Sequence, residues 1–190
     1  MRTARMLPTL ESTRLRLRWL TKADVPALYE VFGDSEVCRY WSRPALRDMA
    51  EADMLLRDIE RGYASRTLSQ WGIATREHDR AIGTCTLTSF SLEHRRAEIG
   101  FALGRASWGC GYATEALHAL VAHAFESLDL RRLEADVDPR NARSIRLLER
   151  LGFRPEGLQR QRYLIDGEAQ DALLYGLLTS EWPPAGRCDS

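Results

Sequence analysis

Lysine is almost absent from this sequence, although basic side chains are common. Of the 27 basic residues only Lys22 is a lysine, so the other 26 are arginines. A GC-rich genome is the simplest explanation of such a bias. Schiff-base chemistry and the phosphate-binding P-loop both require a lysine side chain. Either chemistry would therefore have to come from Lys22.

Long apolar runs, paired cysteines and metal-spaced histidines are also missing. No apolar run approaches the roughly 20 residues of a membrane helix, and the N-terminal segment has no apolar core of a secretory signal. The four cysteines form no C-x-x-C pair, and His118 and His123, five residues apart, would not share a helix face. We therefore expect free thiols, a cytoplasmic location, no membrane partner and no metal site.

Charge and composition exclude further classes. The 27 basic and 27 acidic side chains cancel, whereas a general nucleic-acid binder carries a net basic footprint. The 190 residues, 44% hydrophobic and 28% charged, are typical of a globular chain that buries its own core. We expect one domain over residues 1–182 and a frayed tail over residues 183–190.

Hydrophobic spacing predicts a succession of strands and helices. Arg14–Leu20 alternates with the period of a strand, and Thr21 with Asp24 predicts a capping box that opens a helix to about Phe32. A second helix is predicted over Arg47–Arg61, ended by Gly62. The remaining predicted elements are strands over Ser69–Arg76, Ala81–Phe90 and Arg95–Leu103, a helix over Tyr112–Leu128, a strand over Leu133–Val137, a helix from Asn141 to Leu151, and a hairpin of Phe153–Leu164 and Glu168–Leu178 around Asp166–Gly167.

The order of these elements predicts a mixed α/β fold. The three middle strands, separated by short polar turns, are typical of an antiparallel meander. The strand before the loop Gly104–Gly111 and the strand after the following helix form a β-α-β unit, which should be parallel and right-handed.

The most informative segment runs from Glu98 to Ala116, EIGFALGRASWGCGYATEA. A strand enters a loop whose small residues lead directly into a helix. Unpaired N–H groups at such a helix N-terminus, together with the helix dipole, suit an anion such as a pyrophosphate. Glycines let the ligand approach the backbone closely.

Three alternatives compete for this loop. A P-loop is excluded because no lysine is present. A Rossmann fingerprint is met only as Gly109-x-Gly111-x-x-Thr114, and it follows a meander rather than a first parallel strand. A glycine-rich turn without any ligand remains possible for the segment taken alone.

Taken with the rest of the chain, this loop resembles that of the GNAT acetyltransferases, in particular the branch similar to ribosomal-protein N-terminal alanine and serine acetyltransferases. The resemblance covers nearly the whole chain and lies in TRLRLR from Thr13, DSEVCRYW from Asp34, AEIGF from Ala97, WGCGYATEA from Trp108, NARSIRLLERLGF from Asn141 and LYGLL from Leu174. It implies a GNAT fold, with splayed strands in a mostly antiparallel sheet flanked by helices.

The resemblance also implies an acetyl-CoA site without a metal. The strand before the loop would pair with pantetheine through Phe101, Ala102 and Leu103. The pyrophosphate would bind to the loop amides of Gly109, Cys110, Gly111, Tyr112, Ala113 and Thr114. Asn141 would hydrogen-bond the pantetheine arm, and Ser144 would lie near the thioester sulfur.

Two departures from the family pattern are visible. The broad family motif opens with Gln or Arg where this chain has Trp108, a change that is common in this branch. Some members carry a tyrosine as general acid at the position of Leu148, and a leucine cannot donate a proton.

Acetyl transfer to an amine requires a neutral amine, donors for the oxyanion and a proton for the departing thiolate. Glu98 is the favoured base, with Asp136 as the alternative on an acidic strand face. For both residues, pairing with arginine in a solvated face competes with a catalytic role. Ser144 is the candidate acid, although a serine there can be incidental, and Tyr163 is a weaker candidate.

We therefore expect an acetyl-CoA-dependent N-acetyltransferase that acts by direct attack of a primary amine, such as a protein N-terminal α-amine. The alternatives are acetylation of a small-molecule amine (antibiotic, polyamine or amino acid) and a catalytically silent CoA-binding module. The protein is expected to be a monomer or a homodimer.

Overall fold

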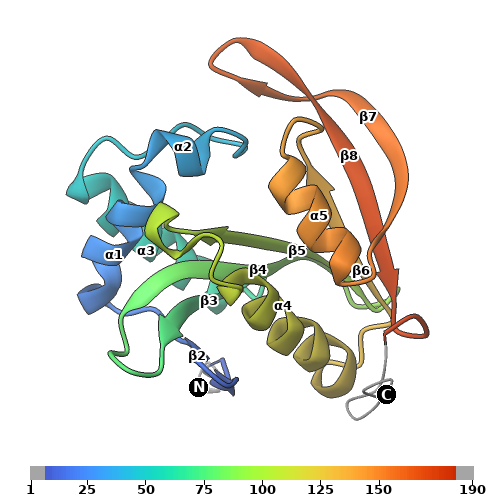
Figure 1. The fold of residues 1–190 in the computed structure, drawn as a ribbon, viewed down its shortest axis with the longest axis horizontal. Coiled ribbons are helices and arrows are strands. Elements are labelled where there is room, and N and C mark those ends of the chain that lie inside the picture. The colour runs from blue at the N-terminus through green and yellow to red at the C-terminus, as the bar shows by residue number, and fades with distance from the viewer. Residues whose placement is uncertain (1–6, 183–190) are drawn as a thin grey trace.

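One sheet of eight strands forms the centre of the structure, a computed structural model that describes residues 7–182 (Figure 1). Its strands are β1 (Leu10–Glu11), β2 (Leu15–Arg18), β3 (Leu68–Thr75), β4 (Ala81–Ser91), β5 (Arg96–Leu103), β6 (Arg132–Val137), β7 (Arg154–Ile165) and β8 (Glu168–Leu178). They lie in the order β1-β2-β3-β4-β5-β6-β8-β7, and only β5 and β6 are parallel. The expected mixed, mostly antiparallel sheet with a parallel β-α-β unit is confirmed. The tail predicted for residues 183–190 lies outside the described residues.

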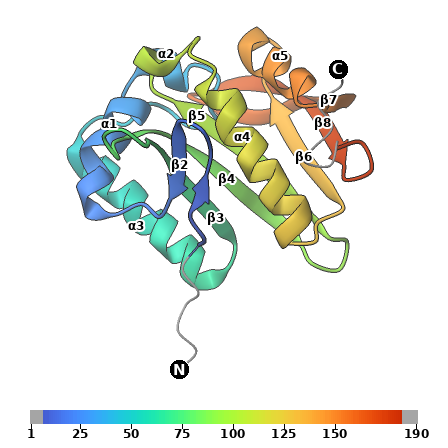
Figure 2. The ribbon, with the colours of Figure 1, turned by 60° about the horizontal axis from the view of Figure 1, so that its bottom comes forward.

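Helices cover both faces of the sheet (Figures 1 and 2). They are α1 (Val25–Phe32), α2 (Ser35–Cys38), α3 (Met49–Ser65), α4 (Tyr112–Ala122) and α5 (Ala142–Arg150). On one face, leucines of α4 and α5 bury themselves against β2 to β6, and on the other face α1 and α3 pack around Leu20 and Ala102. The apolar strand residues lie mostly in the first of these two layers, and Ala102 of β5 lies in the second.

The end of α3 differs from the prediction. Gly62 does not terminate the helix, which continues to Ser65 and ends at Arg66 with φ of 60°. A Cβ on Gly62 would come within 2.6 Å of the Cβ of Leu68, so the glycine permits close packing of the helix on β3. The start differs too, because Asp48 caps the helix by accepting a hydrogen bond from Glu51 N at 2.9 Å.

Other boundaries differ by about one turn. Thr21 and Asp24 form the predicted capping box, but it opens a 3-10 turn before α1. The helix predicted over Tyr112–Leu128 is α-helical only to Ala122 and continues as a π-helical turn to Ser127. Strand β1 and helix α2 were not predicted, since two and four residues are too short for a periodic signal.

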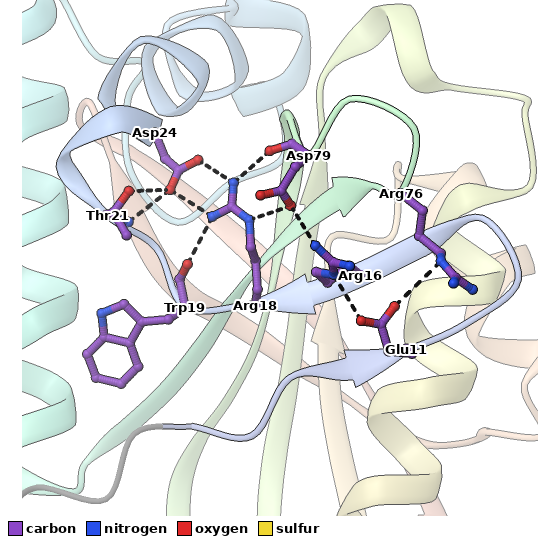
Figure 3. Close-up of polar contacts among 8 residues, drawn as sticks. All are labelled: Glu11, Arg16, Arg18, Trp19, Thr21, Asp24, Arg76 and Asp79. Carbon is purple, nitrogen blue, oxygen red and sulfur yellow. Dashed lines mark hydrogen bonds and ion pairs between the residues drawn. The ribbon is translucent and has the colours of Figure 1, made fainter.

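A network of hydrogen bonds and ion pairs around Arg18 connects β2 to the start of α1 (Figure 3). Arg18 donates to both oxygens of Asp24 at 2.8 and 2.9 Å and to Asp79 at 2.9 Å. Burial opposes ionisation of Asp24, but hydrogen bonds from Arg18 and Thr21 outweigh it and hold the pKa of Asp24 below its usual value. The network fixes the first helix against the end of β2 and the β3–β4 turn.

Candidate functional site

Strands β5 and β6 separate after a short stretch of pairing. Their register covers only three positions, of which Glu98 opposite Glu134 is the last. Beyond it, β5 stays paired with β4 as far as Leu103, while no strand in the described chain pairs with its other edge. The expected splayed strands are confirmed. Phe101, Ala102 and Leu103 form this stretch, where the backbone groups that point away from β4 can bind a ligand, apart from the carbonyl of Leu103, which is bonded to Trp108.

The glycine loop closes the end of β5. Trp108 Nε1 donates to the carbonyl of Leu103 at 2.8 Å, which turns the chain toward α4. Gly109 and Gly111 then have φ of 77° and 78°, values that side chains rarely adopt. A Cβ on Gly109 would meet no atom within 4 Å, so conformation rather than crowding requires this glycine.

The first turn of α4 presents free backbone donors. Because α4 begins at Tyr112, the N–H groups of Tyr112, Ala113 and Thr114 have no acceptor within the helix. These residues are only half-buried, so a ligand can reach them. The arrangement can bind an anion through backbone N–H groups and the helix dipole.

Arg14, which sequence reasoning missed, holds this loop from outside. Its Nη1 donates to the carbonyl of Cys110 at 2.9 Å, its Nε donates to Glu115 at 2.7 Å, and its guanidinium lies 4.6 Å from the ring centroid of Tyr112. Burial opposes ionisation of Glu115, but hydrogen bonds from Arg14 and Ser12 keep the pKa of Glu115 below its usual value. Arg14 thus fixes the conformation of the glycine loop.

Asn141 and Ser144 lie at the start of α5. The side-chain oxygen of Asn141 accepts a hydrogen bond from Ser144 N at 3.1 Å and so caps the helix. The carboxamide nitrogen of Asn141 and the hydroxyl of Ser144 make no hydrogen bond within residues 7–182. Leu148 is 1% exposed and belongs to the core, so this position supplies no acid.

Glu98 has no arginine partner in the part of the chain that the structure describes. The neighbouring arginines pair with other acids, Arg96 with Glu134 at 2.5 Å and Arg95 with Asp129 at 3.2 Å. Burial raises the pKa of Glu98, and the negative charge of Asp136 raises it further. A carboxylate made more basic in this way has the property that a general base needs.

The acids of β6 are paired, unlike Glu98. Asp136 accepts hydrogen bonds from Arg162 Nε at 2.9 Å and from the hydroxyl of Tyr163. Glu134 is likewise bonded to Arg132 at 2.9 Å, and Asp138, which directly follows β6, is bonded to Arg140 at 2.6 Å. The alternative of an arginine-paired face therefore applies to this strand.

The hydroxyl of Tyr163 donates its hydrogen bond to Asp136. Burial raises the pKa of Tyr163, and its hydrogen bond to Asp136 raises the pKa further. Strand β7 supplies both Tyr163 and Arg162, and no sequence signal linked either residue to Asp136 on β6. Pairing across the final hairpin brings them together.

A cavity elsewhere in the molecule lacks the residues found at the opening between β5 and β6. A cavity of about 700 Å³ lies beside α1, and part of the network in Figure 3 lines it, namely Arg18, Trp19, Thr21, Asp24 and Asp79. Its charged side chains are paired with one another, Arg18 with Asp24 and Asp79, and Arg80 with Glu30. None of the predicted site residues lines it.

The described residues hold neither a metal-binding cluster nor a helix that could span a membrane. Residues 7–182 contain no group of three or more His, Cys, Asp or Glu side chains that could hold a metal ion. No helix among them has both the length and the apolar character needed to cross a membrane. Cys38, Cys85 and Cys110 are free thiols, and Cys188 lies outside the described residues.

Comparisons with known proteins agree with this geometry. A family described as the acetyltransferase (GNAT) domain matches residues 14–154. A Bacillus licheniformis protein described as the uncharacterized N-acetyltransferase p20 is 36% identical over 176 residues, which are 93% of this chain and 99% of that protein. The [ribosomal protein uS5]-alanine N-acetyltransferase of Escherichia coli K12 is 37% identical over 86 residues, 45% of this chain and 44% of that enzyme. Mycobacterium smegmatis RimJ in complex with CoA-disulfide shares the fold, with a TM-score of 0.82 at 23% identity over 93% of this chain and 90% of that chain.

Proposed function

Because this chain belongs to the GNAT family of N-acetyltransferases, we propose that it moves an acetyl group from acetyl-CoA to a primary amine at the opening between β5 and β6. The observation that carries the proposal is the three-residue pairing of these strands, which leaves a free strand edge leading directly into the glycine loop. We also propose that residues 1–182 form one catalytic domain and that the enzyme acts in the bacterial cytoplasm as a monomer or homodimer.

The residues at this opening fit acetyl-CoA. The backbone groups of Phe101 to Leu103 that point away from β4, apart from the carbonyl bonded to Trp108, offer donors and acceptors for the amides of pantetheine. The carboxamide nitrogen of Asn141 can donate to a pantetheine carbonyl while its oxygen caps α5. The pyrophosphate would bind the amides of Gly109, Cys110, Gly111, Tyr112, Ala113 and Thr114.

The chain supplies the groups that direct transfer needs. The amine nitrogen attacks the thioester carbon and forms the C–N bond of a tetrahedral oxyanion, and Glu98 takes the amine proton through an ordered water. The C–S bond then breaks as the carbonyl re-forms. Free backbone N–H groups on β5 stabilise the oxyanion. Ser144 donates toward the departing thiolate, which takes its proton from the serine or from solvent.

The acceptor we propose is a protein N-terminal α-amine. Support comes from the Escherichia coli relative, which is named a [ribosomal protein uS5]-alanine N-acetyltransferase. An α-amine has a pKa of about 7.7–8.0, so one weakly basic carboxylate such as Glu98 is sufficient to deprotonate it, whereas a lysine amine requires more help. Small-molecule amines (antibiotics, polyamines or amino acids) are the alternative acceptors.

An acceptor screen tests this proposal. The purified protein is incubated with acetyl-CoA and lysine-free peptides that begin with Ala or Ser, a polyamine, an aminoglycoside or free amino acids, and release of free thiol is followed. The matched control is each peptide with its N-terminus already acetylated. We expect turnover with a free N-terminus and none with the blocked one. Turnover with small amines alone supports the alternative acceptor, and binding of acetyl-CoA without turnover of any amine identifies a silent CoA-binding module.

A further inference from the structure

An arginine on α5 lies against the glycine loop without an acidic partner. The Arg143 guanidinium stands 4.6 Å from the ring centroid of Trp108, the residue that immediately precedes Gly109. Arg143 is exposed, and it makes no ion pair or side-chain hydrogen bond within residues 7–182. The ring that it contacts is itself fixed, because Trp108 Nε1 is bonded to the carbonyl of Leu103. The cation is therefore held in place beside the loop.

The position of Arg143 is unfavourable for the helix that carries it. Arg143 is the second residue of α5, whose first turn contains no acidic residue. A cation there lies at the positive end of the helix dipole, which is unfavourable. Its contribution to helix stability therefore does not explain this arginine, whereas a negatively charged ligand would.

Three arginines lie near the glycine loop, and two of them are paired with acids. The stack of Arg143 on Trp108 brings the N-terminus of α5 next to the loop that opens α4. The other arginines at the loop are already engaged, Arg14 with Glu115 at 2.7 Å and Arg105 with Asp34 at 3.2 Å. Arg143 is thus the guanidinium near this loop that the described residues leave unneutralised.

We propose that Arg143, held on the face of Trp108, binds a phosphate group of acetyl-CoA. The inference rests on the proposed function and adds a side-chain cation to the backbone amides of the loop. A guanidinium offers several N–H donors in a planar fork and remains charged at all relevant pH values, which suits a phosphate. The phosphate is either the pyrophosphate or the 3′-phosphate, and the two differ in a way that cosubstrate analogues can separate.

The proposed role of Arg143 is tested with three acetyl donors and three forms of the protein. The kcat and KM of the wild type, Arg143→Ala and Arg146→Ala are measured with acetyl-CoA, acetyl-3′-dephospho-CoA and S-acetylpantetheine at one fixed salt concentration. Arg146 is the matched control, since it is an exposed arginine on the next turn of α5 that stacks on no aromatic ring within residues 7–182. A melting curve of each variant accompanies the kinetics.

We expect Arg143→Ala to raise the KM for acetyl-CoA about tenfold, the effect of one charge-assisted hydrogen bond, with kcat unchanged. S-acetylpantetheine, which lacks phosphates, should be used equally by Arg143→Ala and the wild type. If the KM of Arg143→Ala is also raised for acetyl-3′-dephospho-CoA, Arg143 binds the pyrophosphate. If that increase disappears with the dephospho analogue, Arg143 binds the 3′-phosphate.

Three results would overturn the inference: an unchanged KM for acetyl-CoA, an equal loss with S-acetylpantetheine, or the same loss in Arg146→Ala. The first shows no contact, the second a structural effect, and the third a general attraction of charge. A wild type without turnover of acetyl-CoA refutes the proposed function itself, so the two failures are distinguishable.

Discussion

Replacing Glu98 by Gln removes the carboxylate at the point where β5 and β6 separate while keeping the size and hydrogen-bonding capacity of the side chain. No ion pair is broken, because the nearby arginines Arg95 and Arg96 pair with Asp129 and Glu134. The substitution therefore isolates the ability of Glu98 to accept a proton. Acetyl-CoA affinity should barely change, since no proposed cofactor contact is removed.

The expected loss of kcat/KM in Glu98→Gln follows from the acid–base chemistry of the site. Loss of a positioned general base costs about 10²- to 10⁴-fold, and we expect the lower limit because Glu98 acts through water. A loss of about 10² in kcat/KM at pH 7 corresponds to about 2.7 kcal/mol in the barrier. An α-amine of pKa about 7.7–8.0 is roughly 9–17% neutral at pH 7, so raising the pH to 10 increases the neutral form about 6- to 11-fold. Between pH 7 and pH 10 the difference in kcat/KM between Glu98→Gln and the wild type should therefore shrink about 6- to 11-fold.

Stability provides the second readout. Burial raises the pKa of Glu98 above its ordinary value of 4.5, so the folded state binds this proton more tightly than the unfolded state. The charge of Glu98 therefore costs stability, which falls as pH rises through the window between 4.5 and the raised value and stays lower above it. Since glutamine carries no charge, the variant should melt at neutral pH at the same or a higher temperature.

The assay measures kcat/KM from pH 6 to 10 beside a melting curve. A destabilised Glu98→Gln variant with a pH profile like that of the wild type would refute the reasoning, because it would show a structural carboxylate. The proton acceptor would then be Asp136 or solvent.

Three further substitutions test neighbouring parts of the account. Asp136→Asn should lower kcat/KM by less than about tenfold, since Asp136 is already bonded to two donors. It should also move the acidic limb of the pH profile to lower pH, because it removes the charge that raises the pKa of Glu98. An acidic limb that stays in place or moves to higher pH contradicts this prediction. Asn141→Asp keeps the cap of α5 but loses the free N–H donors, so the melting temperature should hold while the KM for acetyl-CoA rises several-fold; an unchanged KM removes Asn141 from the cofactor site. Arg14→Met should raise the KM for acetyl-CoA about fivefold, a modest effect for a half-exposed guanidinium, and leave the KM for the acceptor unchanged; equal changes in both KM values indicate general damage to the fold.

Local signals predicted the parts of the site that depend on consecutive residues. The loop before α4 was recognisable because two glycines precede a helix, and both have positive φ in the structure. The cap of α5 by Asn141 and the turn at Asp166–Gly167, with φ of 50° and 84°, follow from the same short-range chemistry.

Contacts between distant segments could not be predicted in this way. Arg14 and Glu115 are 101 residues apart, and each is an ordinary charged residue in its own segment. The bonding of Asp136 to Arg162 and Tyr163 depends on the register of the final hairpin. An acidic strand face shows in the sequence, but which of its acids lacks an arginine emerges only from the fold.

The glycine loop allows one direct test of the cofactor site. Acetyl-CoA is titrated calorimetrically, with and without a chelator, into the wild type, Gly111→Val and Gly167→Val. Valine at either glycine is strained by φ of 78° or 84°, but only Gly111 lies in the loop, so Gly167→Val controls for strain alone. Circular dichroism confirms that each variant is folded.

This titration tests the central claim, that the opening between β5 and β6 and the loop of Gly109 to Thr114 bind acetyl-CoA. The account predicts micromolar affinity for the wild type and for Gly167→Val, independent of the chelator, and an affinity at least about tenfold weaker for Gly111→Val because a side chain occupies the place of the pyrophosphate. No binding to the wild type, binding abolished by the chelator, or full affinity in a folded Gly111→Val variant would contradict it.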